Sequence, residues 1–292
     1  MAEQLNVKAL LRKHGLRPKK SWSQNFLVDL DVLDRIVEAA ELRADDVVVE
    51  LGAGLGALTA MLARQAGRVV AVERDRDLAR VLRSEFAADP RVELLEANAA
   101  RLDFAALRQR LGRRPVVVGN LPYHMASQIV FQLVEAGQQL DRWLVMVQRE
   151  MAQRMVAGPG TRSYGAMSIR LALAAEVLPD LEVPPEAFLP APRVHSQVVR
   201  GRPRSTALVE VRDAAVLDRL IRGVFSQRRK QIFNGLKATF GRELSADAIE
   251  EALQEAGLLP QLRPEQLAVE QFAGLADALA ARLELVQTGG HQ

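Results

Sequence analysis

The stretch that decides the fold is Val47-Val48-Val49-Glu50-Leu51, followed by Gly52-Ala53-Gly54-Leu55-Gly56. A short run of β-branched residues bounded by glycines is typical of a strand buried on both faces. Residues 57–65, after the glycines, have the apolar spacing of a helix. Four more strand-like runs alternate with helical patterns, at residues 68–73, 91–95, 115–118 and 143–147. Strands that alternate with helices predict a parallel sheet covered on both faces.

The hydrophobic pattern changes near Pro203. Before it, residues 177–183 and 197–202 predict an antiparallel pair of strands at the end of the sheet. After it come four helical segments, at 214–225, 230–240, 246–255 and 264–285. A chain of 292 residues is long enough for two domains. We therefore expect an α/β domain over residues 1–204 and a small all-helical domain over residues 205–292.

The glycine-rich loop indicates a ligand that carries an adenosine group. Glycines at a strand-to-helix turn allow positive φ angles and let a ligand approach the backbone closely. Glu73 ends the next strand, 21 residues after Gly52, where an acid accepts hydrogen bonds from the ribose hydroxyls. Glu50 disfavours a pyrophosphate and favours a cationic ligand, so we expect S-adenosylmethionine rather than NAD. The alternative is a tight turn without a ligand, with Glu73 as a surface acid.

Asn120-Leu121-Pro122-Tyr123 follows the fourth strand-like run, at the strand end where ligands bind in open α/β sheets. The N6 atom of adenine is a poor nucleophile because its lone pair is delocalised into the ring. The Asn120 side-chain oxygen and the Leu121 carbonyl can accept both N6–H bonds and direct that lone pair at a methyl group. Pro122 offers no competing N–H, and Tyr123 offers a ring on which the base can stack. The alternative is a turn with a packed tyrosine.

Composition and charge exclude several classes of protein. Apolar residues make up 49% of the chain, enough for a core, and the absence of cysteine excludes disulfides and thiolate metal sites. No apolar run has the length of a membrane span, and residues 1–20 lack the apolar core of a signal peptide. We therefore expect a cytoplasmic protein without membrane association and without a metal.

The positive charge is concentrated in two segments. Residues 1–20 hold six Lys/Arg against one acid, and residues 193–242 hold twelve against three. Two basic segments on an otherwise acidic chain predict a surface that binds a polyanion. A solvated helix face would carry the same charge, and that alternative remains open here.

Five motifs, in order along the chain, resemble the ribosomal RNA adenine dimethyltransferase family. They are S-W-S-Q-N-F-L at residues 21–27, E-L-G-A-G-L-G-A-L-T at 50–59, N-L-P-Y at 120–123, F-L-P-A-P-R-V-H-S at 188–196, and Phe225 with R-R-K and N-G-L up to residue 236. The resemblance extends from Lys19 to about Gln271. It implies a seven-stranded Rossmann-like methyltransferase fold with a small helical C-terminal domain that binds RNA and the ribosome.

The resemblance also implies a cofactor, a substrate and their contacts. The implied methyl donor is S-adenosyl-L-methionine, held by Asn25, Leu27, Gly52, Gly54, Glu73, Asn98 and Asn120. The implied substrate is two adjacent adenines in the 3′-terminal hairpin loop of 16S rRNA, each methylated twice at N6, in the 30S subunit or its precursor. A role in 30S biogenesis follows. We expect a monomer, because the sequence shows no apolar seam.

Further site residues follow from the same motifs. Phe188 is expected as the second wall of the base slot opposite Tyr123, with a core position as the alternative. The basic residues expected to contact RNA are Lys19, Lys20, Arg193, Arg228, Arg229 and Lys230.

The chain departs from the family at Asn98, where the family usually has Asp after the third strand. The amide oxygen of Asn98 can still accept one bond from adenine N6–H. The lost charge predicts cofactor binding weaker by about 1 kcal/mol. Ser23 replaces a usual Gly, Arg193 a usual Lys, and His195 stands where Asp is often found.

Three alternatives are weighed against the dimethyltransferase. One is a methyltransferase of the macrolide-resistance type that acts on a 23S rRNA adenine. The second is a ribosome-assembly factor with weak methylation, for which Asn98 is the one sequence indication. The third is an NAD-dependent dehydrogenase, which leaves residues 120–123 unexplained. Residues 188–196 and 225–236 look more like the small-subunit enzyme than like the resistance enzyme.

Overall fold

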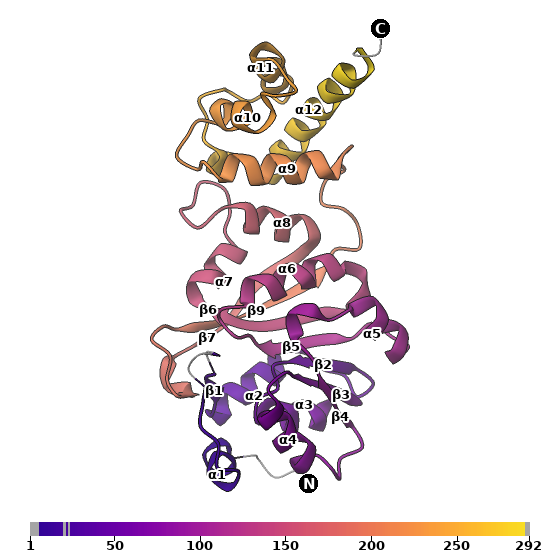
Figure 1. Cartoon of the computed structure of the whole chain (residues 1–292), viewed down its shortest axis with the longest axis vertical. Coiled ribbons are helices and arrows are strands. Elements are labelled where there is room, and N and C mark those ends of the chain that lie inside the picture. Colours follow the sequence, from indigo (N-terminus) through magenta and orange to yellow (C-terminus); the bar gives the residue numbers. More distant parts are fainter. Residues whose placement is uncertain (1–5, 20–21, 23, 290–292) are drawn as a thin grey trace. The chain divides into compact units, whose positions relative to one another are not determined.

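The computed structural model describes residues 6–19, 22 and 24–289, which form two compact units (Figure 1). The first unit comprises Met1–Ala152 and Ala175–Ser205, and the second comprises Gln153–Ala174 and Thr206–Gln292. The main part of the second unit begins one residue after the predicted boundary. Residues 153–174, which the sequence analysis placed in the first domain, belong to the second unit.

A seven-stranded sheet forms the centre of the first unit, in the order β4-β3-β2-β5-β6-β9-β7. Its strands, in chain order, are β2 (Val47–Leu51), β3 (Arg68–Glu73), β4 (Val92–Glu96), β5 (Val116–Asn120), β6 (Arg142–Gln148), β7 (Ala175–Val183) and β9 (Ser196–Pro203). The first five are parallel to one another, and β9 runs antiparallel to both β6 and β7. The predicted fold class is therefore confirmed, including the antiparallel strands at the edge.

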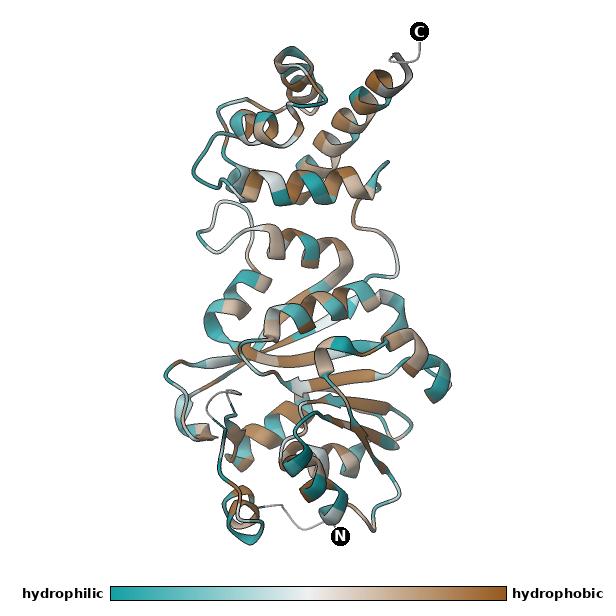
Figure 2. Cartoon of the chain, in the orientation of Figure 1, coloured by the Kyte–Doolittle hydropathy of each residue, from teal (hydrophilic) through white to brown (hydrophobic). Residues whose placement is uncertain are grey.

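Helices cover both faces of this sheet (Figure 1). On one face lie α2 (Leu30–Ala39), α3 (Ala57–Gln65) and α4 (Arg76–Glu85), and on the other lie α5 (Phe104–Leu111) and α6 (Ala126–Ala136). The central strands are mostly hydrophobic in Figure 2, because both of their faces are buried. Val48, Val116 and Val118 pack with α2 and α3 in one core cluster. Helix α5 was not predicted.

The N-terminal segment folds against the first unit. Helix α1 (Val7–Lys13) buries Val7, Leu10 and Leu11 in a cluster with Phe26 and Leu78. Strand β1 (Phe26–Leu27) then pairs antiparallel with β8 (Phe188–Leu189) in a separate two-stranded sheet. The sequence analysis treated residues 1–20 as a basic arm and missed α1, which at 7 residues is too short for a clear helical period.

The second unit is helical. Its helices are α8 (Ala166–Ala174), α9 (Ala214–Phe225), α10 (Ile232–Phe240), α11 (Ala246–Glu255) and α12 (Val269–Gly289), preceded by the end of α7 (Arg149–Met155). Residues 153–174 join this unit because Tyr164 and Ile169 are buried in its core with Leu220 and Phe272. The Tyr164 hydroxyl also donates to the Leu267 carbonyl at 3.0 Å.

None of the helices in the described part of the chain has the length and apolar character needed to cross a bilayer.

Candidate active site

A cavity opens in the first unit where β2, β3 and β5 end. Ligands bind at the carboxyl ends of the strands in open α/β sheets, so the cavity lies where the topology predicts it. Its wall includes the following residues that the sequence analysis selected: Asn25, Leu27, Glu50, Gly52, Gly54, Glu73, Asn120, Leu121, Pro122 and Tyr123. These residues come from four separate segments of the chain, which the fold brings together at the carboxyl ends of the strands.

The glycine loop is tied to Glu73 by its backbone. Gly54 has a φ of +60°, in the left-handed region, and its N–H donates to Glu73 Oε2 at 2.9 Å. Glu73 Oε1 accepts the N–H groups of Arg74 and Asp75, each at 2.8 Å. Burial raises the pKa of Glu73, while these backbone bonds work in the opposite direction. The carboxyl is therefore held in one orientation on the cavity wall, at the end of β3.

Glu50 is a fully buried acid at the end of β2. Its Oε2 accepts a hydrogen bond from the Thr59 hydroxyl at 2.5 Å, and its side chain reaches the cavity wall. Burial raises the pKa of Glu50 to about 8, partly offset by the Thr59 bond. At neutral pH most of this group carries a proton, and a cationic ligand in the cavity would favour its ionised form.

The Asn120–Tyr123 turn follows β5. The Asn120 amide nitrogen donates to the Asn25 carbonyl at 3.2 Å, so the amide oxygen remains to accept another hydrogen bond. Leu121 N–H donates to the Met146 carbonyl at 3.1 Å and anchors the turn to β6. The Tyr123 hydroxyl lies 2.9 Å from that of Ser196. The turn thus has one end on the sheet and its aromatic ring at the cavity.

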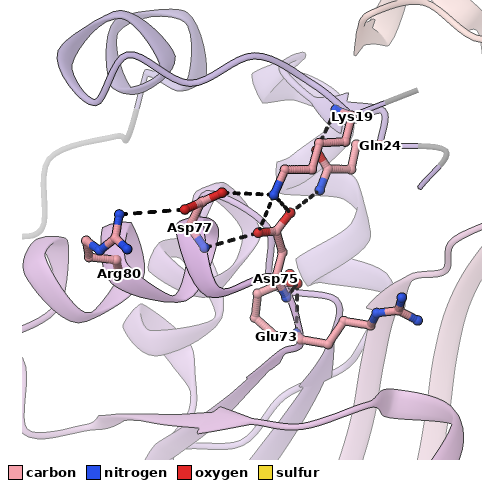
Figure 3. A network of polar contacts seen from close by, with 7 residues as sticks. Lys19, Gln24, Glu73, Asp75, Asp77 and Arg80 are labelled. Atoms are coloured by element: carbon pink, nitrogen blue, oxygen red, sulfur yellow. Dashed lines mark hydrogen bonds and ion pairs between the residues drawn. The ribbon is translucent and has the colours of Figure 1, made fainter. Parts of the chain in front are cut away.

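A polar network joins the N-terminal segment to the start of α4 (Figure 3). Lys19 Nζ donates to both Asp75 oxygens at 2.8 Å and to Asp77 at 2.9 Å. Gln24 donates to Asp75 at 2.8 Å and accepts the Lys19 N–H at 2.8 Å. Burial works to raise the pKa of Asp75, but its bonds from Lys19 and Gln24 outweigh this and hold that pKa below its usual value. The network places Gln24 and Asn25 at the cavity wall.

This network changes the interpretation of Lys19. The sequence analysis expected Lys19 to contact RNA, but the structure pairs its ammonium with two carboxylates, and hydrogen bonds to Asp75 and Asp77 raise its pKa. Paired in this way, Lys19 has little charge to offer a phosphate. Lys20 lies outside the described residues.

Sequence reasoning missed several residues of the cavity wall. Trp22 stacks under the Arg74 guanidinium, whose carbon lies 4.2 Å from the ring centroid, and Arg74 also reaches Met125 Sδ at 3.4 Å. Trp22, Arg74 and Met125 all line the cavity. Trp22 lies within the 21–27 motif and Arg74 directly follows Glu73, so their positions next to selected residues were the available signal.

Two selected residues do not line the cavity. Asn98 caps a short helix, and its Oδ1 accepts the Ala100 N–H at 3.1 Å, while its neighbours Ala97 and Ala99 are on the wall. Phe188 is 4% exposed and packs with Leu27 and Val183 in the core. Phe188 pairs with Leu27 across β8 and β1 and is not among the residues that line the cavity, so its expected place opposite Tyr123 stays a prediction.

The three basic residues that the sequence analysis selected in the second unit lie in one loop after α9. Arg229 and Lys230 are exposed, whereas Arg228 donates to the Arg162 carbonyl at 3.0 Å and lies 3.6 Å from Glu265. Arg162, from residues 153–174, is exposed and contacts this loop through its backbone carbonyl, and the sequence analysis did not select it. In the first unit, Arg193 is exposed on the loop before β9.

The order of the sheet, its antiparallel edge and the cavity at the ends of its central strands are those of Rossmann-like methyltransferases. Within that class, the chain belongs to the ribosomal RNA adenine dimethylase family, whose model matches residues 15–280. The family expected from the five motifs is therefore confirmed, and with it an rRNA adenine dimethyltransferase activity.

Similar curated proteins are called ribosomal RNA small subunit methyltransferase A. The protein of Anaeromyxobacter dehalogenans is 46% identical, over 93% of this chain and 97% of its own length. The protein of Myxococcus xanthus is 41% identical, over 92% of this chain and 94% of its own. That of Latilactobacillus sakei is 39% identical, over 94% and 93%.

Two solved structures are also similar. The 23S rRNA methyltransferase ErmE is 27% identical with a TM-score of 0.67, covering 88% of this chain and 100% of its own. A dimethyladenosine transferase from Plasmodium falciparum has a TM-score of 0.76 over 90% of this chain and 98% of its own, and at 23% identity it shows the fold alone. The relatives with higher identity carry the small-subunit name, so the 23S alternative is not favoured.

Proposed function

We propose that this chain transfers methyl groups from S-adenosyl-L-methionine to N6 of two adjacent adenines in 16S rRNA, within the 30S subunit or its precursor. The observation that carries the proposal is the Asn120–Tyr123 turn, which shares one cavity with the glycine loop and Glu73. The names of the relatives at 39–46% identity support the small subunit as the substrate. We propose that a monomer carries out the reaction.

The residues present fit the proposed cofactor. Glu73 presents a fixed carboxyl at the end of β3, where a ribose would donate its hydroxyls. Glu50 is a buried acid without a cationic partner among its described contacts, which suits a ligand with positive charge. When bound, S-adenosyl-L-methionine supplies a methyl group on a positively charged sulfur.

The turn after β5 would prepare the adenine. The Asn120 amide is oriented by the Asn25 carbonyl, so its oxygen can accept one N6–H bond, and the Leu121 carbonyl can accept the other. Holding both hydrogens draws the nitrogen lone pair out of the ring and directs it at the methyl group. Tyr123 provides the stacking surface for a base that has left its helix. As the bond from N6 to the methyl carbon forms, the bond from that carbon to sulfur would break, and N6 would release one of its protons to solvent. Because no strong general base is needed, positioning would supply most of the rate.

The basic loop of the second unit would bind the RNA backbone. Arg229 and Lys230 are exposed and have no ionic partner among the described residues, and the exposed Arg162 contacts the same loop through its backbone carbonyl. Phosphate contacts of this kind add affinity and orientation but no sequence specificity. We include Arg193 of the first unit in this proposal.

The experiment that tests the proposal is transfer of tritiated methyl groups from S-adenosyl-L-methionine. Undermethylated 30S subunits and 23S rRNA are offered in parallel, and the labelled nucleosides are then separated. We expect N6,N6-dimethyladenosine in the 16S rRNA and none in the 23S rRNA. Label in the 23S rRNA would instead favour the resistance-type enzyme. Tight 30S binding without label would indicate an assembly factor.

A further inference from the structure

The Tyr123 ring is held at its far end by a residue from a distant part of the chain. The hydroxyls of Tyr123 and Ser196 lie 2.9 Å apart, and either one can donate. Tyr123 stands in the turn after β5, whereas Ser196 is the first residue of β9. The two residues are 73 positions apart in the sequence, and the segment between them includes everything from α6 to β8. The contact therefore depends on the tertiary fold and joins the cavity wall to the antiparallel edge of the sheet.

The two partners differ in how firmly they are held. Ser196 has no exposed surface and is paired on both sides, with Gln148 of β6 and Val183 of β7. Tyr123 is partly exposed and stands in a turn that is closed by the Met125 N–H to Pro122 carbonyl bond of 2.9 Å. A ring that receives a base on one face cannot be packed on both faces. The orientation of the Tyr123 ring must then be fixed at its edge, where the phenol hydroxyl is the group that can form a hydrogen bond.

We infer that Ser196 is a positioning residue, which holds the Tyr123 ring in the orientation that stacks on the target adenine. This inference rests on the proposed function, since it assigns Ser196 a part in the same reaction. Ser196 itself does not line the cavity and acts through Tyr123. A supporting contact of this kind lowers the freedom of the residue that touches the substrate. In a merely structural role, the bond to Tyr123 would serve only to satisfy the buried Ser196 hydroxyl.

The ionisation of Tyr123 agrees with this arrangement. Burial raises the pKa of Tyr123, and the bond from Ser196 works in the opposite direction. The phenol therefore keeps its proton at neutral pH, and its uncharged ring can stack. Removal of the Ser196 hydroxyl takes away the lowering influence, so the pKa of Tyr123 rises further.

The composition of the chain makes the contact directly observable. It has two tyrosines, Tyr123 and Tyr164, so protein labelled with 13C at the tyrosine ζ carbon gives two NMR signals. Tyr123→Phe assigns them. We expect Ser196→Ala to shift the Tyr123 signal and its titration and to leave the Tyr164 signal unchanged, because Tyr164 bonds to Leu267 in the other unit.

The kinetic test uses single-turnover methylation of 30S subunits with saturating S-adenosyl-L-methionine. We expect Ser196→Ala and Tyr123→Phe each to lower the methylation rate by about three- to tenfold, the size of one neutral hydrogen bond. The double variant should be no slower than either single variant, because both remove the same bond. Ser196→Thr keeps the hydroxyl and should restore the rate. If Thr is too large for this buried position, Tyr123→Phe still removes the bond from its more exposed side.

Ser168→Ala is the matched control. Ser168 is also buried, at 2% exposure, and its hydroxyl donates to the Arg154 carbonyl at 2.6 Å, in the second unit. Its loss should lower stability without changing the methylation rate. An unshifted Tyr123 signal in Ser196→Ala, or a shifted signal with a wild-type rate, would overturn the inference. An inactive wild-type protein would instead overturn the proposed function, so the two failures are distinguishable.

Discussion

Two asparagines of the first unit bond to the backbone through different ends of their side-chain amides. Asn120 gives its amide nitrogen to the Asn25 carbonyl and keeps its oxygen as an acceptor. The Asn98 oxygen accepts the Ala100 N–H, so one of its two lone pairs is already used. The sequence analysis predicted both as acceptors toward a ligand. The residue type predicts that an amide can accept a bond, but which end the backbone occupies depends on neighbours in the folded chain.

Glu50 makes the stability of the fold depend on pH in a defined direction. Its pKa of about 8 in the folded protein lies above its ordinary value of 4.5, so the folded protein retains a proton that the unfolded chain releases. The free energy of unfolding should therefore fall as the pH rises from about 4.5 to about 8 and level off above that. Glu50→Gln imitates the protonated acid and should remove this dependence.

The measurement is urea unfolding of both proteins across this pH range. Between about pH 5.5 and pH 8.5, we expect the wild-type protein to lose about 1–3 kcal/mol relative to Glu50→Gln. Parallel pH profiles for the two proteins would show that Glu50 is ionised in the folded state.

Among the elements, the central strands were predicted well because valine-rich runs buried on both faces are distinctive. Residues 68–73 and 214–225 coincide with β3 and α9. The strands β1 and β8 have two residues each, too few for any periodicity, and they exist because Phe26 and Leu189 meet in the folded chain. Helix α1 was not predicted because it has only three buried residues, in a short segment that also holds basic ones.

The start of α4 is the element that fixes the N-terminal segment over the cavity. Asp75 caps this helix by accepting the Asp77 N–H at 3.0 Å, and it also accepts Lys19 and Gln24 (Figure 3). Asp75→Ala should lower the free energy of unfolding by about 2 kcal/mol, since it removes a cap and leaves buried donors without a partner. It should also weaken cofactor binding several-fold, measured by calorimetry, because Gln24 and Asn25 lose their anchor.

Asp103→Ala is the control for the loss of a helix cap. Asp103 caps α5 in the same unit by accepting the Ala106 N–H at 2.9 Å, and it does not line the cavity. Its removal should cost about 1 kcal/mol of stability and leave cofactor affinity unchanged. Equal cofactor affinities of Asp75→Ala and Asp103→Ala would contradict the anchoring role of the network.

For the whole molecule, the sequence predicted two domains but not the membership of residues 153–174. Helical spacing shows that α7 and α8 are helices, yet it cannot show which core they join. That depends on Tyr164 and Ile169, whose partners on α9 and α12 lie 50 or more residues further along the chain. The same segment contacts the basic loop through the Arg162 carbonyl, and the sequence did not predict this contact.

The exposed charges of this loop lead to a prediction about salt. Arg229→Ala with Lys230→Ala should reduce the dependence of RNA affinity on salt by about 1.4 in the slope of log K against log [salt], because two phosphate contacts to single-stranded RNA are lost. Filter binding over a series of KCl concentrations measures the slope. Arg110→Ala with Arg114→Ala removes the same charge from α5 and the segment after it, and should leave the slope unchanged. Equal slopes for the two double variants would place the RNA surface elsewhere.

The central claim is that the cavity of the first unit carries out methyl transfer to adenine N6, with Asn120 acting on the base. The most direct test compares Asn120→Ala with the wild-type protein in two measurements, tritiated methyl transfer to undermethylated 30S subunits and equilibrium binding of S-adenosyl-L-methionine. We predict that Asn120→Ala forms no dimethyladenosine and binds the cofactor almost as tightly as the wild-type protein. Wild-type transfer by Asn120→Ala would contradict the account, and loss of cofactor binding would reassign Asn120 to the cofactor.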